Sequence, residues 1–420
     1  MTVVKERSKK HMYDAIIVGA RCAGSPTAML LARKGYRVLV VDRATFPSDT
    51  ISTHIIWPHG AAIMDRWGLL GRLAATGCPP TALNLIFDVG PFALKGGVID
   101  TNAGRGGFCP RRTVLDKLLV DAAVEAGAEL REGFTVEAVL WDGDRVAGIK
   151  GHGRSGGSVE ERARIVIGAD GVHSLLATAV RASEYDTKPP LATNYYSYYS
   201  GFAADDLEQY VRDYQAVGCF PTHDGLTLIA VLWPSSRFQE IRSDVEGHVW
   251  KVLESTPTVG DRLRAATREE KWVGTAGVPN YFRQPFGPGW ALVGDAAYNK
   301  DPITAQGISD AFLDADALAQ ALDDGWSGRC PLNEALAERQ ARRDQRAKPM
   351  YDFTCQLATL EPAPPHMRQL FAALRENQEA TNQFYSAITG SRPLPTFMSP
   401  ENIDRIVASA GAREGVPRTP

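Results

Sequence analysis

The chain has 420 residues, of which 44% are hydrophobic and 23% charged, and its formal net charge at pH 7 is −3. This composition is ordinary for a soluble globular protein, and the length suits two domains. No basic surplus indicates nucleic acid as a partner, and no apolar stretch is long enough for a membrane span.

The six cysteines are scattered along the chain and form no CxxC pair. That spacing argues against a zinc ribbon, against any other metal site of this kind and against a redox-active dithiol. We therefore expect six reduced thiols, no bound metal and a cytoplasmic location.

The first predicted elements form a strand–helix–strand unit. Residues 13–20 (YDAIIVGA) are a short apolar run typical of a buried strand, and residues 37–42 (RVLVVD) are a second one. A helix rich in small residues is expected over 23–34, with Gly35 at its C-terminal end. The unit has the usual size of a right-handed βαβ crossover.

The loop after the first strand resembles a dinucleotide-binding fingerprint. Two of its glycines are present and Arg21 replaces the middle one; the loop reads Gly19, Ala20, Arg21, Cys22, Ala23, Gly24. A pyrophosphate is expected at the helix N-terminus, where free N–H groups favour anions. Arg21 either holds a phosphate oxygen or points away and leaves the contact to the backbone. We expect Cys22 to be a packing residue.

The end of the second predicted strand carries Asp42 and Arg43, which we assign to the same site. Asp42 lies 23 residues after Gly19. A carboxylate there accepts hydrogen bonds from ribose hydroxyls and repels a 2′-phosphate, so the bound nucleotide is predicted to be FAD or NAD.

Further along the chain, a helix is expected over 113–127 and strands around 134–140, 146–150 and 165–168, with a glycine-rich turn at 151–157. Residues 186–280 indicate a mostly antiparallel sheet, with an aromatic run at 195–200 and a β-rich run at 225–233. After about residue 330 the chain is helical and charged.

Two later motifs accompany the first loop: IVIGADGVHS at 165–174 and WALVGDAAYNKDPITAQGISDA at 290–311. Together the three resemble the signatures of the class A flavoprotein monooxygenases, the para-hydroxybenzoate hydroxylase-like family. The wider superfamily includes flavin halogenases and geranylgeranyl reductases. The resemblance covers roughly residues 12–330. It implies an α/β fold, with a Rossmann-like FAD-binding domain of βαβ units and parallel sheet beside an antiparallel substrate domain.

The resemblance also assigns cofactor-binding residues. Asp295, after Gly294, matches the aspartate that binds the ribityl chain of non-covalent FAD. The turn into the following helix is matched by Pro302, Ala305, Gln306 and Gly307, and the family usually has glycine where Ala305 stands. A helix beginning near Ala305 would direct its free N–H groups at the flavin N1/C2=O edge, where negative charge collects on reduction.

Three more residues come from the same resemblance. Asp170 matches an aspartate beside the flavin phosphates, and Arg112, in the Arg-x-x-Leu-Asp motif, matches an arginine that contacts FAD near a helix start. The alternative for Arg112 is a surface cap residue. Val136 lies where the family's strand places its backbone against the adenine, although core packing would also explain a valine there.

On the substrate side the family shares no fixed catalytic residue, so the candidates come from the residues themselves. His54 is the candidate for a proton relay or flavin contact, because imidazole titrates near neutral pH, and a structural histidine is the alternative. Trp57 is expected to pack. Tyr196 and Tyr198 share one strand face that could line an aromatic pocket. His223, in a PTHDG turn, is expected to be solvent-exposed.

These assignments predict a discontinuous FAD-binding domain (12–80, 100–185 and 281–330), a substrate domain (81–99 and 186–280) and a C-terminal helical region (331–420). The helical region either caps the substrate pocket or makes a homodimer contact.

The resemblance implies a monooxygenase that takes electrons from NADH or NADPH, which binds only transiently. With O2 it would oxygenate a small aromatic or polyketide-like molecule through a flavin C4a-hydroperoxide. The alternative is a geranylgeranyl-reductase-like enzyme, although its cysteine-glycine cluster is absent. A flavin halogenase is disfavoured because no Trp-x-Trp-x-Ile-Pro motif occurs. A non-catalytic flavin-binding module is the remaining possibility.

Overall fold

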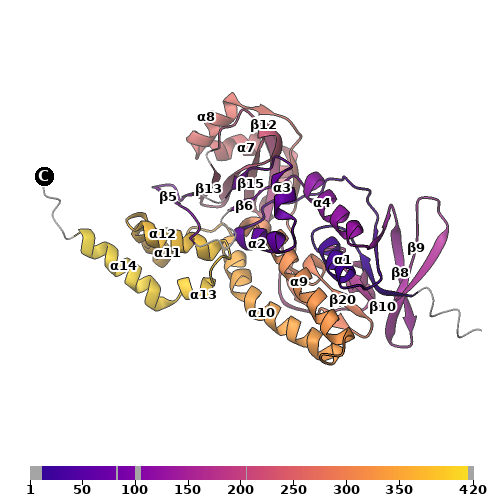
Figure 1. Cartoon of the computed structure of the whole chain (residues 1–420). Coiled ribbons are helices and arrows are strands. Elements are labelled where there is room, and N and C mark those ends of the chain that lie inside the picture. The colour runs from indigo at the N-terminus through magenta and orange to yellow at the C-terminus, as the bar shows by residue number, and fades with distance from the viewer. Residues whose placement is uncertain (1–11, 82–83, 100–105, 205, 415–420) are drawn as a thin grey trace, which may run out of the picture.

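A computed structural model of the chain describes residues 12–81, 84–99, 106–204 and 206–414 (Figure 1). Its first layer is a sheet with the strand order β20–β10–β1–β2–β7, in which every neighbouring pair is parallel. The five strands are β20 (Trp290–Leu292), β10 (Ser158–Gly168), β1 (Tyr13–Val18), β2 (Val38–Asp42) and β7 (Glu129–Glu132); the short β19 (Phe286–Gly287) joins β20 antiparallel.

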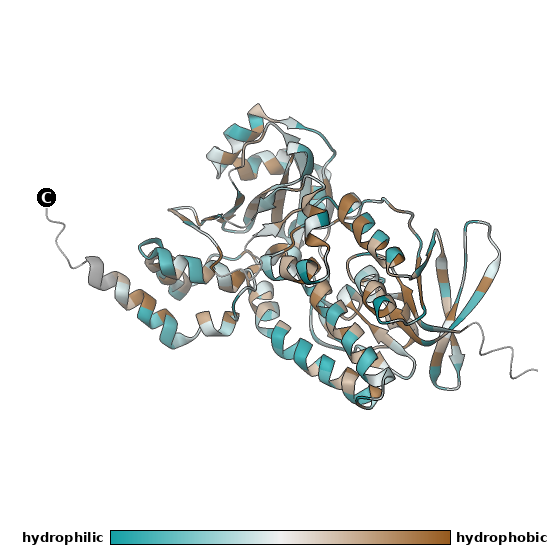
Figure 2. Ribbon diagram, in the orientation of Figure 1, coloured by the Kyte–Doolittle hydropathy of each residue, from teal (hydrophilic) through white to brown (hydrophobic). Residues whose placement is uncertain are grey.

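Both faces of this sheet are covered, which explains why β1 and β2 are continuously apolar. Three helices cover one face: α1 (Gly24–Arg33), α4 (Arg112–Glu125) and α9 (Gly307–Trp326). The antiparallel strands β8 (Thr135–Asp142) and β9 (Arg145–His152) cover the other face with α5 (Leu175–Ala179). Figure 2 shows the hydrophobic residues gathered on the sheet, whereas the long helix along the outside is largely hydrophilic.

The second sheet has the order β16–β12–β15–β14–β13–β4–β5, and only the β13–β4 pair is parallel. Three helices cover one of its faces: α6 (Phe238–Ser243), α7 (Val245–Glu254) and α8 (Pro257–Ala265). The strands are β16 (Thr267–Arg268), β12 (Ala192–Ser200), β15 (Thr227–Pro234), β14 (Gln215–Pro221), β13 (Leu207–Arg212), β4 (Leu85–Asp88) and β5 (Ala93–Gly96), and β17 (Val273–Thr275) also pairs with β12. The predicted α/β fold class is thereby confirmed.

Short elements join the two sheets. The helices α2 (Pro58–Arg66) and α3 (Leu70–Ala74) are followed by β3 (Pro80–Thr81), which pairs with β6 (Gly107–Phe108). A three-stranded sheet contains β11 (Glu184–Lys188), β18 (Asn280–Arg283) and β21 (Tyr298–Asn299).

The C-terminal region contains α10 (Leu332–Leu357), α11 (Pro365–Arg375), α12 (Gln378–Ile388), α13 (Leu394–Phe397) and α14 (Pro400–Glu414). Helix α10 runs along α9 toward the second sheet, where α11 and α12 pack beside β5 (Figure 1). The Tyr385 hydroxyl donates to the Leu94 carbonyl at 2.8 Å. The C-terminal region therefore covers the face of the second sheet that α6, α7 and α8 leave open. A homodimer contact of this region stays a prediction. Within the described ranges, no helix is long and apolar enough to cross a membrane.

One predicted boundary was wrong. The strand expected at 165–168 is the end of the eleven-residue β10, whose polar first half pairs with β9 at the surface and lacks the apolar signal of a buried strand. The helix expected near Ala305 is confirmed: α9 begins at Gly307, after the 3-10 turn η4 (Pro302–Thr304).

Candidate flavin and substrate site

The glycine loop between β1 and α1 makes two approaches that only glycine allows. Gly19 has φ +103°, and a Cβ there would lie 2.3 Å from the Ala169 carbonyl oxygen. A Cβ at Gly24 would lie 1.8 Å from the Gly19 carbonyl oxygen. Ala23 is the N-cap of α1 and no side chain caps that end. In the first turn of α1 the Ser25 and Thr27 N–H groups bond to the Arg21 and Ala23 carbonyls and Pro26 has no N–H, so the Gly24 N–H is the group at this helix end that can face an anion.

Asp42 closes this loop from the carboxyl end of β2. Its carboxylate accepts hydrogen bonds from the backbone N–H of Ala20 at 2.7 Å and of Ala44 at 2.8 Å. Each oxygen keeps a second lone pair, so the carboxylate can still accept from a ribose hydroxyl. The neighbouring Arg43 is exposed at the edge of the cleft.

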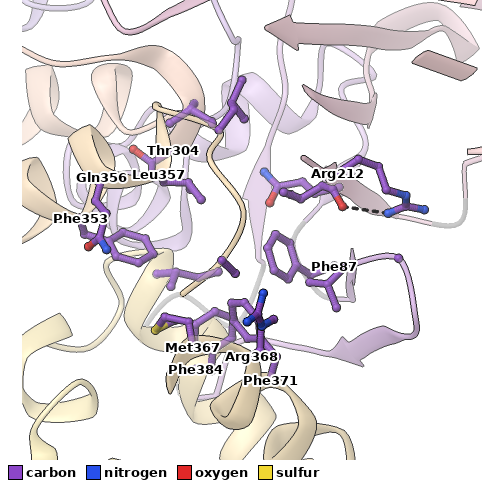
Figure 3. A pocket seen from close by; sticks show the side chains of 18 of the residues that line it. Phe87, Arg212, Thr304, Phe353, Gln356, Leu357, Met367, Arg368, Phe371 and Phe384 are labelled. Atoms are coloured by element: carbon purple, nitrogen blue, oxygen red, sulfur yellow. Dashed lines mark hydrogen bonds between the residues drawn. The ribbon is translucent and has the colours of Figure 1, made fainter. Parts of the chain in front are cut away.

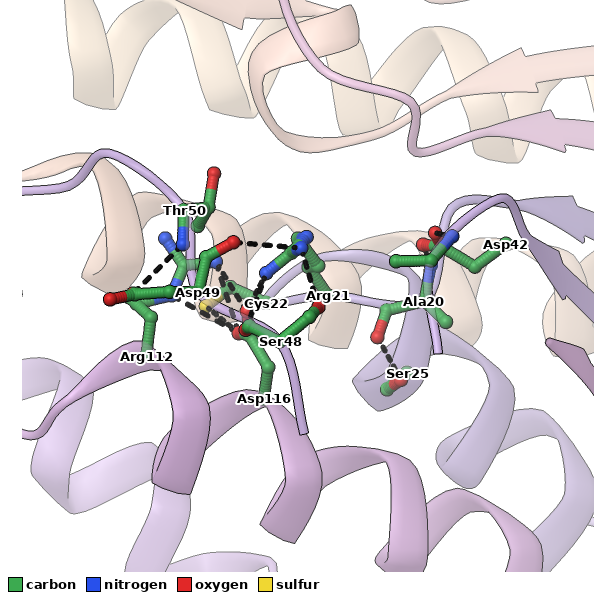
Figure 4. A network of polar contacts seen from close by, with 11 residues as sticks. Ala20, Arg21, Cys22, Ser25, Asp42, Ser48, Asp49, Thr50, Arg112 and Asp116 are labelled. Carbon is green, nitrogen blue, oxygen red and sulfur yellow. Dashed lines mark hydrogen bonds and ion pairs between the residues drawn. The ribbon is translucent and has the colours of Figure 1, made fainter. Parts of the chain in front are cut away.

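Arg21 points toward Ser48 and Asp116 (Figure 4). Its guanidinium pairs with Asp116 at 2.5 Å and donates to the Ser48 hydroxyl at 2.9 Å. Asp116 is fully buried and also accepts three hydrogen bonds from Arg112 at 3.0–3.1 Å and one from the Cys22 thiol at 3.4 Å. This geometry agrees with the alternative in which Arg21 points away from the phosphates and leaves their binding to the loop backbone.

Arg112 is the first residue of α4, yet it is not a surface cap, because only 8% of it is exposed. Its buried pairing with Asp116 fixes the guanidinium beside the glycine loop. Burial raises the pKa of the Cys22 thiol well above its ordinary value, so that the thiol stays protonated. This agrees with the predicted packing role of Cys22.

Asp170 lies on the other side of the loop. One carboxylate oxygen accepts from the Leu175 N–H at 2.7 Å at the start of α5, whereas Oδ1 is buried and has no protein partner. Burial raises the pKa of this carboxyl group. A buried oxygen without a donor is uncommon and fits a ligand contact. Val136, on β8, packs beside Phe134 and Val139, so packing alone accounts for its side chain.

The Gly-Asp motif leaves Asp295 exposed. Gly294 has φ +62°, and a Cβ there would lie 2.7 Å from the Ala23 Cβ. Asp295 is reached by water, yet the surrounding protein desolvates its carboxyl group and raises its pKa to about 6, against the opposing effects of Arg112 and Lys300. Lys300 itself forms an ion pair with Asp310.

The turn that follows leads into α9. Ala305 has φ +53°, the left-handed region that explains the glycine expected at this position. Gln306 donates to the Ile388 carbonyl at 3.0 Å, which ties the turn to α12. No side chain caps the N-terminus of α9, which begins at Gly307. Its free N–H groups can face an electron-rich ring edge.

The residues of the cleft therefore fit FAD. The close-packed glycine loop and the N-terminus of α1 could hold a pyrophosphate, Asp42 could accept from a ribose hydroxyl, and Asp295 could accept from the chain beyond. The uncapped α9 would hold the pyrimidine edge of the flavin ring.

His54 is completely buried and hydrogen-bonded through both ring nitrogens. Nδ1 lies 2.7 Å from the Ser52 carbonyl oxygen and therefore donates to it, so Nε2 accepts from the Tyr198 hydroxyl at 2.8 Å. Burial lowers its pKa to about 3, with smaller contributions from Arg112 and Arg111. The premise that this imidazole titrates near neutral pH was wrong. His54 also has a left-handed φ of +65°, a strained conformation that its surrounding contacts must hold in place.

Tyr196 and Tyr198 share one face of β12 and lie edge-on to His54, with ring centroids 5.6 and 5.9 Å from the imidazole. Tyr195 and Tyr199 pack on the opposite face. The shared face was correctly predicted, although neither Tyr196 nor Tyr198 is among the residues that line the large cavity described below.

The prediction for His223 was wrong, because only 2% of it is exposed. Its turn is covered by the start of α4 and the end of α3: the ring accepts from the Arg111 N–H at 3.1 Å and lies 2.8 Å from the Thr76 hydroxyl. The Arg111 guanidinium lies 3.9 Å from the Tyr198 ring centroid. The sequence did not predict that Arg111 lies beside these aromatic residues. Its position next to Arg112 was the only signal in the sequence.

A cavity of about 780 Å³ opens next to the turn that precedes α9 (Figure 3). Trp57 and Thr304 form its buried end, where the indole N–H donates to the Thr304 carbonyl at 3.0 Å. Trp57 thus packs, as predicted, and also borders this space. The second sheet and the C-terminal helices form the walls, including Phe87, Phe371 and Phe384.

The two-sheet fold and its dinucleotide cleft define a flavin-dependent oxidoreductase. The profile of the FAD binding domain family matches residues 12–354, and the chain belongs to this family.

Relatives with different chemistries match most of the chain. A 1H-pyrrole-2-carbonyl-[peptidyl-carrier protein] brominase from Pseudoalteromonas luteoviolacea is 24% identical over 74% of this chain and 78% of its own. A digeranylgeranylglycerophospholipid reductase from Methanopyrus kandleri is 27% identical over 72% and 74%. A rifampicin monooxygenase from Streptomyces venezuelae is 26% identical over 90% and 78%. The solved structure of the flavin-dependent brominase Bmp2 shares the fold, with a TM-score of 0.78 at 19% identity over 96% of this chain and all of that one.

Proposed function

We propose that the protein is an FAD-dependent monooxygenase that takes electrons from NADH or NADPH and transfers one oxygen atom of O2 to an aromatic or polyketide-like small molecule. The observation that carries this proposal is the position of the cavity. It begins at the buried residues Trp57 and Thr304, directly beside the turn that would hold the flavin ring, and the C-terminal helices form part of its wall. Oxygen transfer needs a space that is shielded from water beside the flavin, because water would compete for the reactive oxygen.

FAD would supply the electron transfer and the oxygen activation, and the chain's residues would bind and orient it. Asp42 and the glycine loop would hold the nucleotide half, and Asp295 with the α9 N-terminus would hold the flavin half. The helix dipole would stabilise negative charge at the pyrimidine edge of the reduced ring. His54 remains neutral and engaged at both nitrogens, so we assign it the positioning of the 52–57 segment rather than proton transfer.

The second candidate is the reductase of an isoprenoid double bond. The apolar lining of the cavity favours it, since a prenyl chain would fit there without oxygen chemistry. A halogenase is disfavoured because the Trp-x-Trp-x-Ile-Pro motif is absent from the sequence.

The test is anaerobic reduction of the FAD-loaded protein by NADH and by NADPH, followed by rapid mixing with oxygen in the presence of candidate substrates. A transient absorbance before reoxidation, with product carrying label from ¹⁸O2, is expected. A product that gains hydrogen but no label would assign the reductase instead. A flavin that neither nucleotide reduces would refute the self-sufficient monooxygenase.

A further inference from the structure

The buried end of the cavity offers no charge to a ligand. The Trp57 indole donates to the Thr304 carbonyl, the Thr304 hydroxyl lies 2.8 Å from that of Thr354, and the Thr389 hydroxyl donates to the Tyr385 carbonyl at 2.8 Å. The polar groups at this end are thus already hydrogen-bonded within the protein. An uncharged ligand group can therefore lie against them, whereas a charged one would have no counter-ion there.

The charged residues along the cavity lie at its outer end. Three of them are exposed, Asp213, Glu361 and Arg368, and so is the imidazole of His366. The fourth, Arg212, is half-buried and pairs with Asp88 at 2.8 Å. Among the lining residues in the described ranges, no charged side chain is buried. A charged group on a ligand is therefore accommodated only where the cavity meets solvent.

Between these ends the wall is aromatic and adaptable. Phe371 of α11 meets Phe87 of β4 and Phe384 of α12 edge-on, with centroids 5.7 and 5.9 Å apart. Met367 (Figure 3) and Met398 also line the cavity, and the flexible methionine side chain adapts to irregular ligands. The volume lies in the upper half of the range of about 300–1,000 Å³ for small-molecule sites.

We propose that this cavity selects an extended, largely apolar molecule, which places an uncharged end at Trp57 and Thr304 and keeps any charged group at the outer end. The proposal rests on the proposed function in placing the flavin at the inner end. It excludes small aromatic acids as substrates. A carboxylate at the inner end would lose its hydration without gaining a cation.

Binding of three probes to the FAD-loaded protein tests this proposal. The probes are pyrene, 4-(1-pyrenyl)butanoate, whose charge can stay at the outer end, and 4-hydroxybenzoate, which is too short to reach Trp57 and Thr304 while its charge stays at the outer end. Calorimetry and the shift of the flavin absorption band measure binding. Both pyrenes are expected to bind at least about tenfold more tightly than 4-hydroxybenzoate. Tighter binding of 4-hydroxybenzoate would overturn the proposal.

Filling the cavity provides the matched test. Leu357→Trp adds bulk inside it, whereas Gln369→Trp adds the same bulk on the exposed surface of α11, outside the lining. Pyrene binding is expected to weaken about tenfold or more in the first variant and to remain unchanged in the second. Val89→Trp on the opposite wall serves if Leu357→Trp does not fold. Equal binding by filled and control variants would place the ligand elsewhere and refute the proposal.

Reduction of the flavin by NADH or NADPH, measured without any probe, separates the proposed function from the proposed ligand preference. Pyrene binding without reduction would refute the proposed function and leave the ligand preference intact. Oxygen transfer stimulated only by aromatic acids would refute the ligand preference and leave the proposed function intact.

Discussion

The buried cluster at the glycine loop gives a sharp prediction for Asp116→Asn. The carboxylate has no exposed surface and faces two guanidinium groups, of which Arg112 is 10% and Arg21 is 26% exposed in the side chain. Removal of the negative charge leaves Arg112 buried without a counter-ion. Breaking a buried ion pair from one side costs about 3–5 kcal/mol. Arg21 adds less, because it regains contact with water.

Urea denaturation of the FAD-free protein, followed by circular dichroism, measures this cost as a loss in the free energy of unfolding. Asp121→Asn on the same helix is the control, because its pair with Lys117 is about 40% exposed on each side and is worth at most about 1 kcal/mol. If Asp116→Asn costs no more than Asp121→Asn, the buried-pair reasoning is refuted.

Three further predictions concern the same region. Tyr198→Phe leaves the buried His54 Nε2 without its donor and should lower the free energy of unfolding by about 1–3 kcal/mol, whereas Tyr195→Phe, on the opposite strand face, should leave it nearly unchanged. Burial lowers the pKa of His54 to about 3, so below pH 6.5 the unfolded chain binds a proton at this residue and the folded chain does not. The free energy of unfolding should therefore drop by about 1.4 kcal/mol per pH unit as the pH falls from 6.5 toward 3. Urea titrations of His54→Gln should lack this part of the pH dependence. Gly24→Ala should abolish FAD retention on gel filtration because its Cβ would overlap the Gly19 carbonyl, whereas Gly71→Ala, where the space is open, should retain FAD.

The flavin cleft was predictable because its signals are local in sequence. Gly19, Asp42 and Asp295 stand at strand ends inside short motifs, and each motif specifies a strand, a turn and a helix together. The polar half of β10 was missed, since an edge ribbon has no buried apolar pattern.

The cavity was not predictable because its walls come from distant parts of the chain. Phe87, Phe371 and Phe384 each have an ordinary apolar pattern, and only the packing of α11 and α12 on β4 brings them together. His223 shows the same limit: a turn sequence predicts its conformation but not which helix covers it.

The family match ends at residue 354, whereas the C-terminal part of the cavity wall runs mostly from Gln356 to Met398. The stretch that defines the family and much of the stretch that shapes the ligand space are thus consecutive, nearly non-overlapping pieces of one polypeptide. Substitutions in the last piece can alter which molecule is accepted while the redox centre stays intact. Divergence among homologues, and any engineered change of ligand, should concentrate there, and a chimera joined near residue 355 is the most direct way to transfer one ligand preference to another member of the family.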